Sequence, residues 1–206
     1  MIRSPAAELT KLRKSLTNID STRERMDKLY TSKHIKRIDL DSVYEALFLR
    51  AVTSFEIFLE ELFISTLEGK KQYSKKRVSL NVAFTVKSRQ ALIDLLLQGS
   101  NYMMWLPFPN TEKRAKIYLK DGRPFSELTD GDKSLIKTIT ITRNAIAHKS
   151  PYALNEFQRI VIGSRSLLPG EKNPAGFLRS NTTSSPPTNI FEIYVGELGR
   201  LASFLC

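Results

Sequence analysis

Two long segments with helical periodicity constrain the fold of this chain most strongly. In residues 5–31, leucines and isoleucines recur three, four and seven residues apart, which places them on one face of an otherwise polar helix. Residues 40–68 repeat this spacing with a much wider apolar face, and Gly69 follows as a helix stop. We therefore predict a long amphipathic helix followed by the central helix of an all-α fold.

The rest of the chain carries start and stop signals for shorter helices. They are expected over residues 88–99, 110–122, 129–148, 151–163 and 189–205. Ser88, Ser150 and Asn189 have the residue types that cap helix N-termini. In the third of these helices, residues 139–142 alternate as a strand would, but the wider apolar spacing favours a helix.

Two segments are not predicted to be helical. Residues 78–86 alternate apolar and polar side chains, which indicates an extended insertion or a short strand whose partner the sequence does not identify. Residues 164–188 are rich in Ser, Thr, Pro and Gly and are expected to form a long loop before the C-terminal helix. The length of 206 residues suits a single domain, 1–206, with an N-terminal helix in 1–38 and a core in 40–206.

The charge of the chain favours a polyanionic partner. Its formal net charge is +11, and between residues 70 and 89 there are seven basic residues and no acidic one. Residues 113–123 form a second basic stretch. A nucleic acid is the first candidate partner, and an anionic membrane surface is the second. We predict that the backbone of the nucleic acid, which the resemblance described below makes RNA, binds at Lys70, Lys71, Lys75, Lys76, Arg77, Lys113 and Arg114, and at Lys149 beside the motif.

The cysteine count and the lack of long apolar stretches indicate in which cellular compartment the protein acts. The one cysteine, Cys206, allows neither an intramolecular disulfide nor a cysteine-based zinc site. The N-terminal residues lack the apolar core of a signal peptide, and no stretch has the apolar length of a membrane span. We expect a cytoplasmic protein that does not enter a membrane.

One short segment, residues 143–148, has residue types suited to phosphodiester chemistry. On a helix, Asn144 and His148 share a face, so the amide can orient the imidazole, while the long side chain of Arg143 can reach the same region. A titratable imidazole beside a guanidinium that binds phosphate through two hydrogen bonds could transfer protons at a phosphodiester. The simpler interpretation is that His148 caps the last carbonyls of its helix and Arg143 is solvated.

Other candidates carry weaker signals. His34 stands among basic residues and is expected to be an exposed linker residue. Asp130 and Asp132 could offer carboxylates to a divalent ion, but acidic residues also stabilise the start of a helix. Glu56 lies within the apolar central helix and could join a site, pair with a basic side chain or reach solvent.

The segment Arg143-Asn144-Ala145-Ile146-Ala147-His148 resembles the Arg-x4-His signature of the HEPN superfamily (higher eukaryotes and prokaryotes nucleotide-binding), a group of all-helical ribonucleases. Its flanks resemble the RiboL-PSP-HEPN branch. These flanks are residues 122–125, the stretch 173–179 and the segment 191–198. The resemblance covers residues 40–206 and leaves the segment 78–86 unmapped.

This resemblance implies an HEPN-type helical bundle and a metal-independent endoribonuclease without a cofactor. By the same resemblance, His148 is expected to act as general base or acid, Arg143 to bind the scissile phosphate, and Asn144 to orient the site. The 2′-hydroxyl of RNA attacks its own phosphate and leaves 2′,3′-cyclic phosphate and 5′-hydroxyl ends. The resemblance further implies a homodimer with a composite active site and a role as a toxin or antiphage defence effector, with a possible antitoxin or defence-system partner.

Residue chemistry gives a weaker, independent argument for the homodimer. Transesterification is best served by a base and an acid, and one chain offers a single well-placed histidine, which two-fold symmetry would double. Two alternatives remain. One is a non-catalytic HEPN module that binds RNA or a protein, and the other is a basic helical protein that binds DNA.

Overall fold

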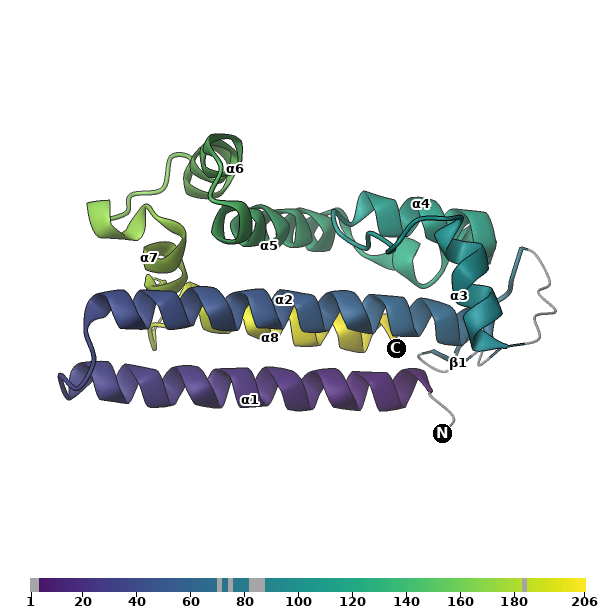
Figure 1. Ribbon diagram of the computed structural model, residues 1–206, viewed down its shortest axis with the longest axis horizontal. Coiled ribbons are helices and arrows are strands. Elements are labelled where there is room, and N and C mark those ends of the chain that lie inside the picture. The colour runs from purple at the N-terminus through teal and green to yellow at the C-terminus, as the bar shows by residue number, and fades with distance from the viewer. Residues whose placement is uncertain (1–3, 70–71, 74–75, 82–87, 183–184) are drawn as a thin grey trace. The chain divides into compact units, whose positions relative to one another are not determined.

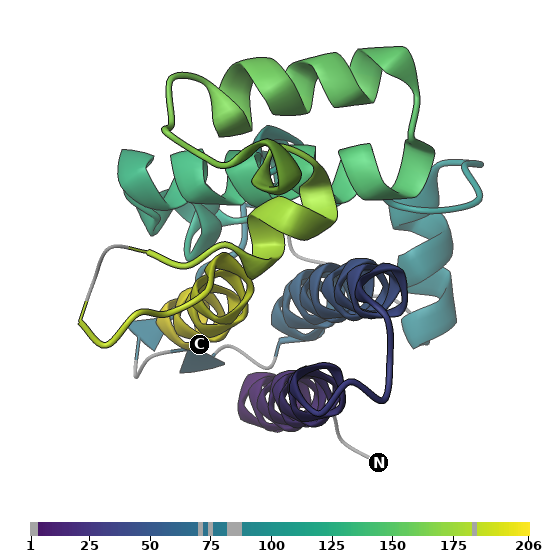
Figure 2. The same ribbon diagram turned by 90° about the vertical axis from the view of Figure 1, so that its left-hand side faces the viewer.

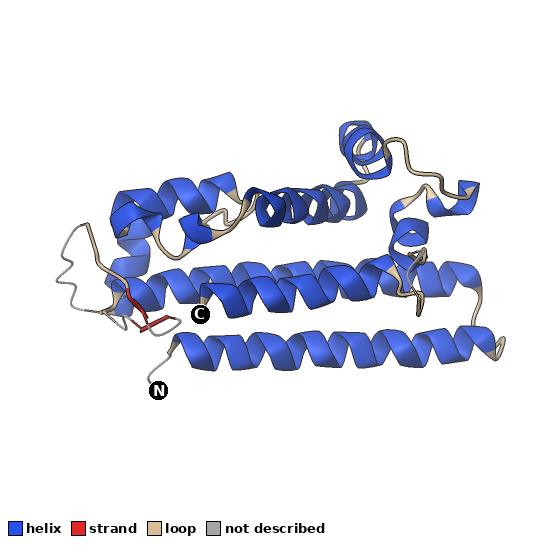
Figure 3. Ribbon diagram, turned by 180° about the vertical axis from the view of Figure 1, so that it is seen from behind, coloured by secondary structure: helices blue, strands red, loops and turns tan. Residues whose placement is uncertain are grey.

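The computed structural model describes residues 4–69, 72–73, 76–81, 88–182 and 185–206. In these residues the fold is all-α apart from a small antiparallel hairpin of β1 (Gln72–Tyr73) and β2 (Lys76–Arg77), shown in red in Figure 3. The predicted all-α class is therefore confirmed. None of the described helices is both long enough and apolar enough to cross a bilayer.

The helices follow one another as labelled in Figure 1. They are α1 (Pro5–Thr31), α2 (Arg37–Leu67), α3 (Arg89–Leu97), α4 (Pro109–Tyr118), α5 (Asp130–His148), α6 (Pro151–Glu156), α7 (Pro174–Arg179) and α8 (Ile190–Leu205). Short 3-10 turns form η1 (Lys120–Gly122), η2 (Phe125–Glu127) and η4 (Pro169–Glu171), and a π-helical turn, η3 (Phe157–Ile162), continues α6.

The observed helices agree closely with the sequence pattern in most places. Helix α1 has the predicted bounds, and α2 begins three residues earlier than predicted. The alternating residues 139–142 are helical within α5. There, the Thr142 hydroxyl donates to the Thr138 carbonyl oxygen at 2.9 Å, which satisfies the polar group of this β-branched residue inside the helix.

The prediction of an unbroken loop over residues 164–188 was wrong. This segment contains η4 and α7. The Asn173 side chain accepts a hydrogen bond from the Gly176 N–H at 2.8 Å, and Pro174 occupies the first helical position. Phe177 is fully buried and contacts Phe157 edge to face. Burial of this aromatic ring therefore stabilises a helix that is too short to form alone.

The described chain divides into two compact units. Unit 1 comprises Met1–Leu12, Phe55–Ile136 and Leu201–Cys206, and unit 2 comprises Arg13–Ser54 and Lys137–Arg200. The boundaries fall inside α1, α2, α5 and α8.

Unit 2 is built on three helical segments that pack side by side, as the end-on view in Figure 2 shows. The later part of α1 and the first part of α2 run antiparallel (Figure 1), and Ser15 and Ser54 join them through a hydrogen bond of 3.0 Å. Aromatic rings of α2 and α8 meet in the core, where Tyr44 contacts Phe191 edge to face at 5.3 Å between centroids.

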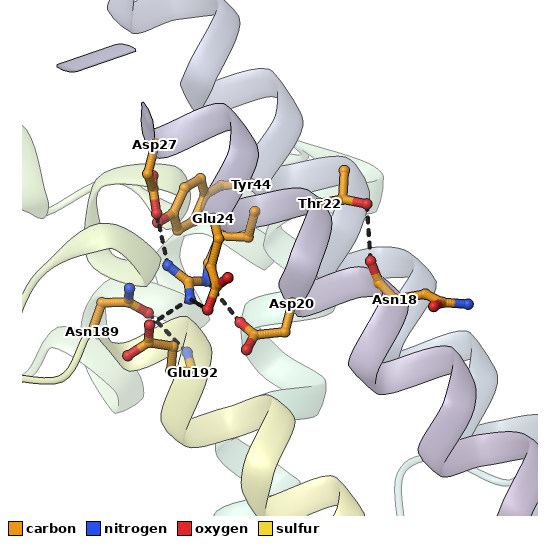
Figure 4. A network of polar contacts seen from close by, with 9 residues as sticks. Asn18, Asp20, Thr22, Glu24, Asp27, Tyr44, Asn189 and Glu192 are labelled. Atoms are coloured by element: carbon orange, nitrogen blue, oxygen red, sulfur yellow. Dashed lines mark hydrogen bonds and ion pairs between the residues drawn. The ribbon is translucent and has the colours of Figure 1, made fainter. Parts of the chain in front are cut away.

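A buried arginine also links these three segments. Arg23 of α1 is 4% exposed and forms ion pairs with Asp20, Asp27 and, on α8, Glu192. The hydroxyl of Tyr44 on α2 donates to Asp27 at 3.0 Å. Figure 4 shows these carboxylates and the tyrosine converging from the three helices. The cluster joins the three segments, because α1, α2 and α8 each contribute a side chain to it.

Unit 1 has an aromatic centre of its own. Phe63 of α2 contacts Trp105, Tyr118 and Phe125 at centroid distances of 5.3–6.0 Å. Arg89 at the start of α3 pairs with Glu61 of α2 and with Glu68, the residue that follows α2, so α3 is fixed to the end of the central helix.

The described part of the predicted extended segment 78–86, residues 78–81, also belongs to unit 1 and has a partner. Leu80 forms an antiparallel bridge with Leu119, just after α4. The Asn81 side chain donates to the carbonyl oxygens of Lys116 and Leu119 at the end of that helix. Residues 82–86 lie outside the described residues.

Candidate functional site

Helix α5 carries the Arg-x4-His segment, and its sequence defines both of its ends. At its start, the Thr129 hydroxyl accepts from the Asp132 N–H, while the Asp132 carboxylate accepts from the Thr129 N–H, a reciprocal capping arrangement. At its end, the Lys149 N–H donates to the Ala145 carbonyl oxygen at 3.2 Å. His148 is therefore the last residue of the helix.

A tight connection follows His148. Lys149 adopts a φ of 48°, in the left-handed region, and Ser150 then caps α6 by accepting from the Ala153 N–H at 3.2 Å. Pro151 occupies the first position of α6, as predicted. The chain turns sharply here, as Figure 1 shows, with α5 across the page and α6 seen end-on. This turn leaves the imidazole of His148 exposed at the helix end.

The buried face of α5 limits which side chains can reach solvent. Within unit 2, Ile139, Thr142, Ala145 and Ile146 are buried. Arg143 and Asn144 are half-buried beside this face, and His148 is exposed.

Arg143 and Asn144 contact each other directly. Arg143 Nη1 donates to Asn144 Oδ1 at 3.1 Å. Within the described part of the chain, Arg143 forms no ion pair, so no described carboxylate neutralises this half-buried guanidinium. The amide was expected to orient His148, but no hydrogen bond between described residues joins the two. Asn144 therefore holds the arginine rather than the histidine.

The His148 side chain makes no hydrogen bond and no ion pair with any described residue. The interpretation that it caps the carbonyls of its own helix therefore has no contact to support it. Its neighbour Lys149 pairs with Glu45 of α2 at 3.0 Å. An exposed imidazole without a protein partner can exchange protons with a molecule that binds over it.

The arrangement could position a phosphodiester. A guanidinium offers several donors in a plane that matches the oxygens of a phosphate, and here one donor is already taken by Asn144. The remaining donors can bind an anion. Arg143 lies on the same helix as the imidazole and five residues before it.

The structure places the predicted RNA-binding residues in different surroundings. Lys113 is exposed on α4, in unit 1, whereas the candidate catalytic residues belong to unit 2. Lys76 and Arg77 form strand β2, and Lys70, Lys71 and Lys75 lie outside the described residues.

Arg114 is half-buried rather than fully solvated. Its guanidinium lies 4.6 Å from the centre of the Trp105 ring and donates to the Met104 carbonyl oxygen at 3.1 Å. Burial lowers the pKa of Arg114, and the charges of Tyr118 and Glu60 oppose that change. An arginine nevertheless stays charged at neutral pH, so Arg114 remains a cation for an anionic ligand.

The weaker candidates are also placed. His34 is exposed in the connection between α1 and α2, as expected, and its Nδ1 lies 2.7 Å from the Ser32 hydroxyl. Asp132 serves as a partner in the cap of α5. Among the described residues, no group of three or more His, Cys, Asp or Glu side chains could hold a metal ion.

Sequence reasoning missed two features of unit 2. Glu45 was not assigned to the Arg-x4-His segment, because its pairing with Lys149 joins residues far apart in the sequence. The Arg23 cluster was also missed, although Asp20, Arg23 and Asp27 have the three- and four-residue spacing of ion pairs along a helix.

Comparisons with protein-family models, with curated proteins and with solved structures find no match for this chain.

Proposed function

We propose that this chain is an HEPN-type endoribonuclease that cleaves RNA without a metal ion or other cofactor. The observation that carries the proposal is the state of two side chains on α5. Arg143 is half-buried, held by Asn144 and paired with no described carboxylate, and His148 is exposed without a described partner. The formal net charge of +11 supports a polyanionic substrate.

In the proposed reaction, an imidazole takes the proton of the RNA 2′-hydroxyl, and that oxygen attacks the adjacent phosphorus. The bond from phosphorus to the 5′-oxygen breaks, and the leaving oxygen receives a proton from a general acid. The products are a 2′,3′-cyclic phosphate and a 5′-hydroxyl. Arg143 stabilises the charge on the phosphate oxygens, and Asn144 keeps the guanidinium in place.

One chain provides one histidine at this segment, whereas the reaction uses both a base and an acid. We propose that two copies of the chain form a homodimer in which their two His148 residues share one composite cleft. Expected biological settings are a cytoplasmic toxin or an antiphage defence effector, restrained by an antitoxin or another defence-system protein.

The proposal is tested by incubating purified protein with single-stranded RNA in the presence of EDTA. Wild-type protein should cut the RNA, and His148→Ala should abolish cutting. Because the His148 side chain is exposed and makes no hydrogen bond or ion pair with a described residue, this variant should keep the wild-type circular dichroism spectrum and melting temperature. His34→Ala is the matched control because it removes the other exposed histidine, and it should cut at the wild-type rate.

Undiminished cleavage by the His148→Ala variant would rule out the assignment. Binding of RNA without any cleavage by the wild type would instead support the alternative, a non-catalytic HEPN module. Stronger binding to duplex DNA than to single-stranded RNA would favour a DNA-binding protein.

A further inference from the structure

A pocket of about 600 Å³ opens in unit 1, between the end of α3 and helix α4. Asn110, Lys113, Arg114 and Ile117 line it from α4, at the three- and four-residue spacing that places them on one face of the helix. Its volume falls within the range of about 300–1,000 Å³ that is typical of small-molecule sites.

The charge inside this pocket has one sign. Lys113 and Arg114 are its charged lining residues, and both are positive; none of the described residues that line it carries a carboxylate. Arg114 is held in position by its contacts with the Trp105 ring and the Met104 carbonyl. The Trp105 indole N–H in turn donates to Glu60 of α2 at 2.8 Å, which fixes the ring. The pocket therefore presents a pre-positioned cation to an anionic ligand.

Large apolar side chains stay exposed around these cations. Tyr102 is 71% exposed, Ile117 is 56% exposed and Met104 is 48% exposed, and all three line the pocket. An exposed tyrosine offers a flat surface on which a base can stack. The side-chain amides of Gln98 and Asn110 add hydrogen-bond donors and acceptors for the polar edge of such a ring.

We propose that this pocket binds a nucleotide, with the base against Tyr102 and the phosphate at Lys113 and Arg114. The nucleotide is either a free nucleoside monophosphate or one residue of a single-stranded RNA. This site goes beyond the proposed cleavage reaction, because it requires neither His148 nor Arg143.

Trp105 is the only tryptophan of the chain and lies beneath Arg114, so its fluorescence reports on the pocket. Titration with adenosine monophosphate should change the emission saturably. Adenosine, which lacks the phosphate, should bind about tenfold more weakly because it forms no charge-assisted hydrogen bonds.

Lys113→Ala should weaken binding of the monophosphate about tenfold for the same reason. Lys116→Ala is the matched control, because Lys116 is exposed on the same helix but does not line the pocket, and it should bind as the wild type does. Tyr102→Ala should weaken binding of both adenosine and its monophosphate, since it removes the stacking surface.

A single-stranded oligoadenylate distinguishes the two sources of the nucleotide. Displacement of this RNA by the monophosphate at equal affinity would assign the pocket to a free nucleotide, and much tighter binding of the oligonucleotide would assign it to RNA. Unchanged emission with both ligands at millimolar concentration would overturn the proposal, as would equal weakening by Lys113→Ala and Lys116→Ala. Binding should persist in His148→Ala, so a failure of the cleavage proposal is distinguishable from a failure of this one.

Discussion

Replacement of Arg23 by alanine should destabilise unit 2 more than any surface substitution on α1. The guanidinium lies 2.8 Å from Asp20, 2.7 Å from Asp27 and 2.5 Å from Glu192. Burial by itself lowers the pKa of Arg23, but its hydrogen bonds with Asp20 and Tyr44 and the charges of Asp20 and Glu192 together raise that pKa above its ordinary value. The arginine is therefore held as a cation by this cluster.

The magnitude follows from what remains after the substitution. Removing one partner of a buried ion pair costs about 3–5 kcal/mol, because the other charge stays without compensation. The carboxylates of Asp20, Asp27 and Glu192 are each about one-third exposed, so water solvates them in part. We therefore expect the lower end, a loss of about 3 kcal/mol in the free energy of unfolding.

Thermal unfolding followed by circular dichroism measures this loss. For a chain of this length, about 3 kcal/mol corresponds to a fall of about 6–12 °C in melting temperature. Arg25→Ala is the matched control, because Arg25 is exposed on the same helix and, among the described residues, donates a hydrogen bond only to Thr22. It should stay within about 0.5 kcal/mol of the wild type. Equal melting temperatures for the Arg23 and Arg25 variants would refute the reasoning.

Two further predictions concern the connection after α5 and the core tyrosine of α8. Lys149 has a positive φ, so Lys149→Gly should be more stable than Lys149→Ala by about 0.5–1 kcal/mol in urea unfolding. Both variants lose the ion pair with Glu45, so greater stability of the alanine variant would contradict the strain argument. Burial raises the pKa of Tyr194 to about 12. The pKa of tyrosine in the unfolded chain is about 10. The stability that Tyr194 contributes through its raised pKa is therefore fully present below that pH and is lost as the pH rises toward 12. Between pH 8 and pH 11, wild-type protein should lose about 1 kcal/mol more unfolding free energy than Tyr194→Phe. Parallel pH profiles of the two proteins would show that Tyr194 does not contribute.

The sequence was sufficient to predict the long helices because their local signals agree. In α1 and α2 the apolar spacing sets the buried face, and in α5 and α6 the capping residues mark the ends. Helix α7 was missed because six residues carry too little periodicity, and its stability comes from burying Phe177. The π-helical end of α6 was missed for a related reason. Its last hydrogen bond, from the Gly163 N–H to the Gln158 carbonyl oxygen, reaches five residues back instead of four, and apolar spacing does not distinguish these two patterns.

The candidate site was predictable as a set of residue types but not as a set of contacts. Spacing on a helix identified Arg143, Asn144 and His148, yet it suggested that Asn144 holds the imidazole. In the structure the amide accepts from the guanidinium of the adjacent Arg143 instead. The pocket beside α4 was predictable only in part, because its basic residues stand out in the sequence while the cation over Trp105 depends on tertiary packing.

Analysis of the ends of the RNA products tests the proposed catalytic role of His148 and Arg143 most directly. RNA cut by wild-type protein in EDTA should end in a 2′,3′-cyclic phosphate and a 5′-hydroxyl, and a 2′-deoxy residue placed at the cleavage site should block cutting there. The His148→Ala and Arg143→Ala variants should yield no such ends. Products with 3′-hydroxyl ends, or equal cleavage at the 2′-deoxy position, would contradict the account.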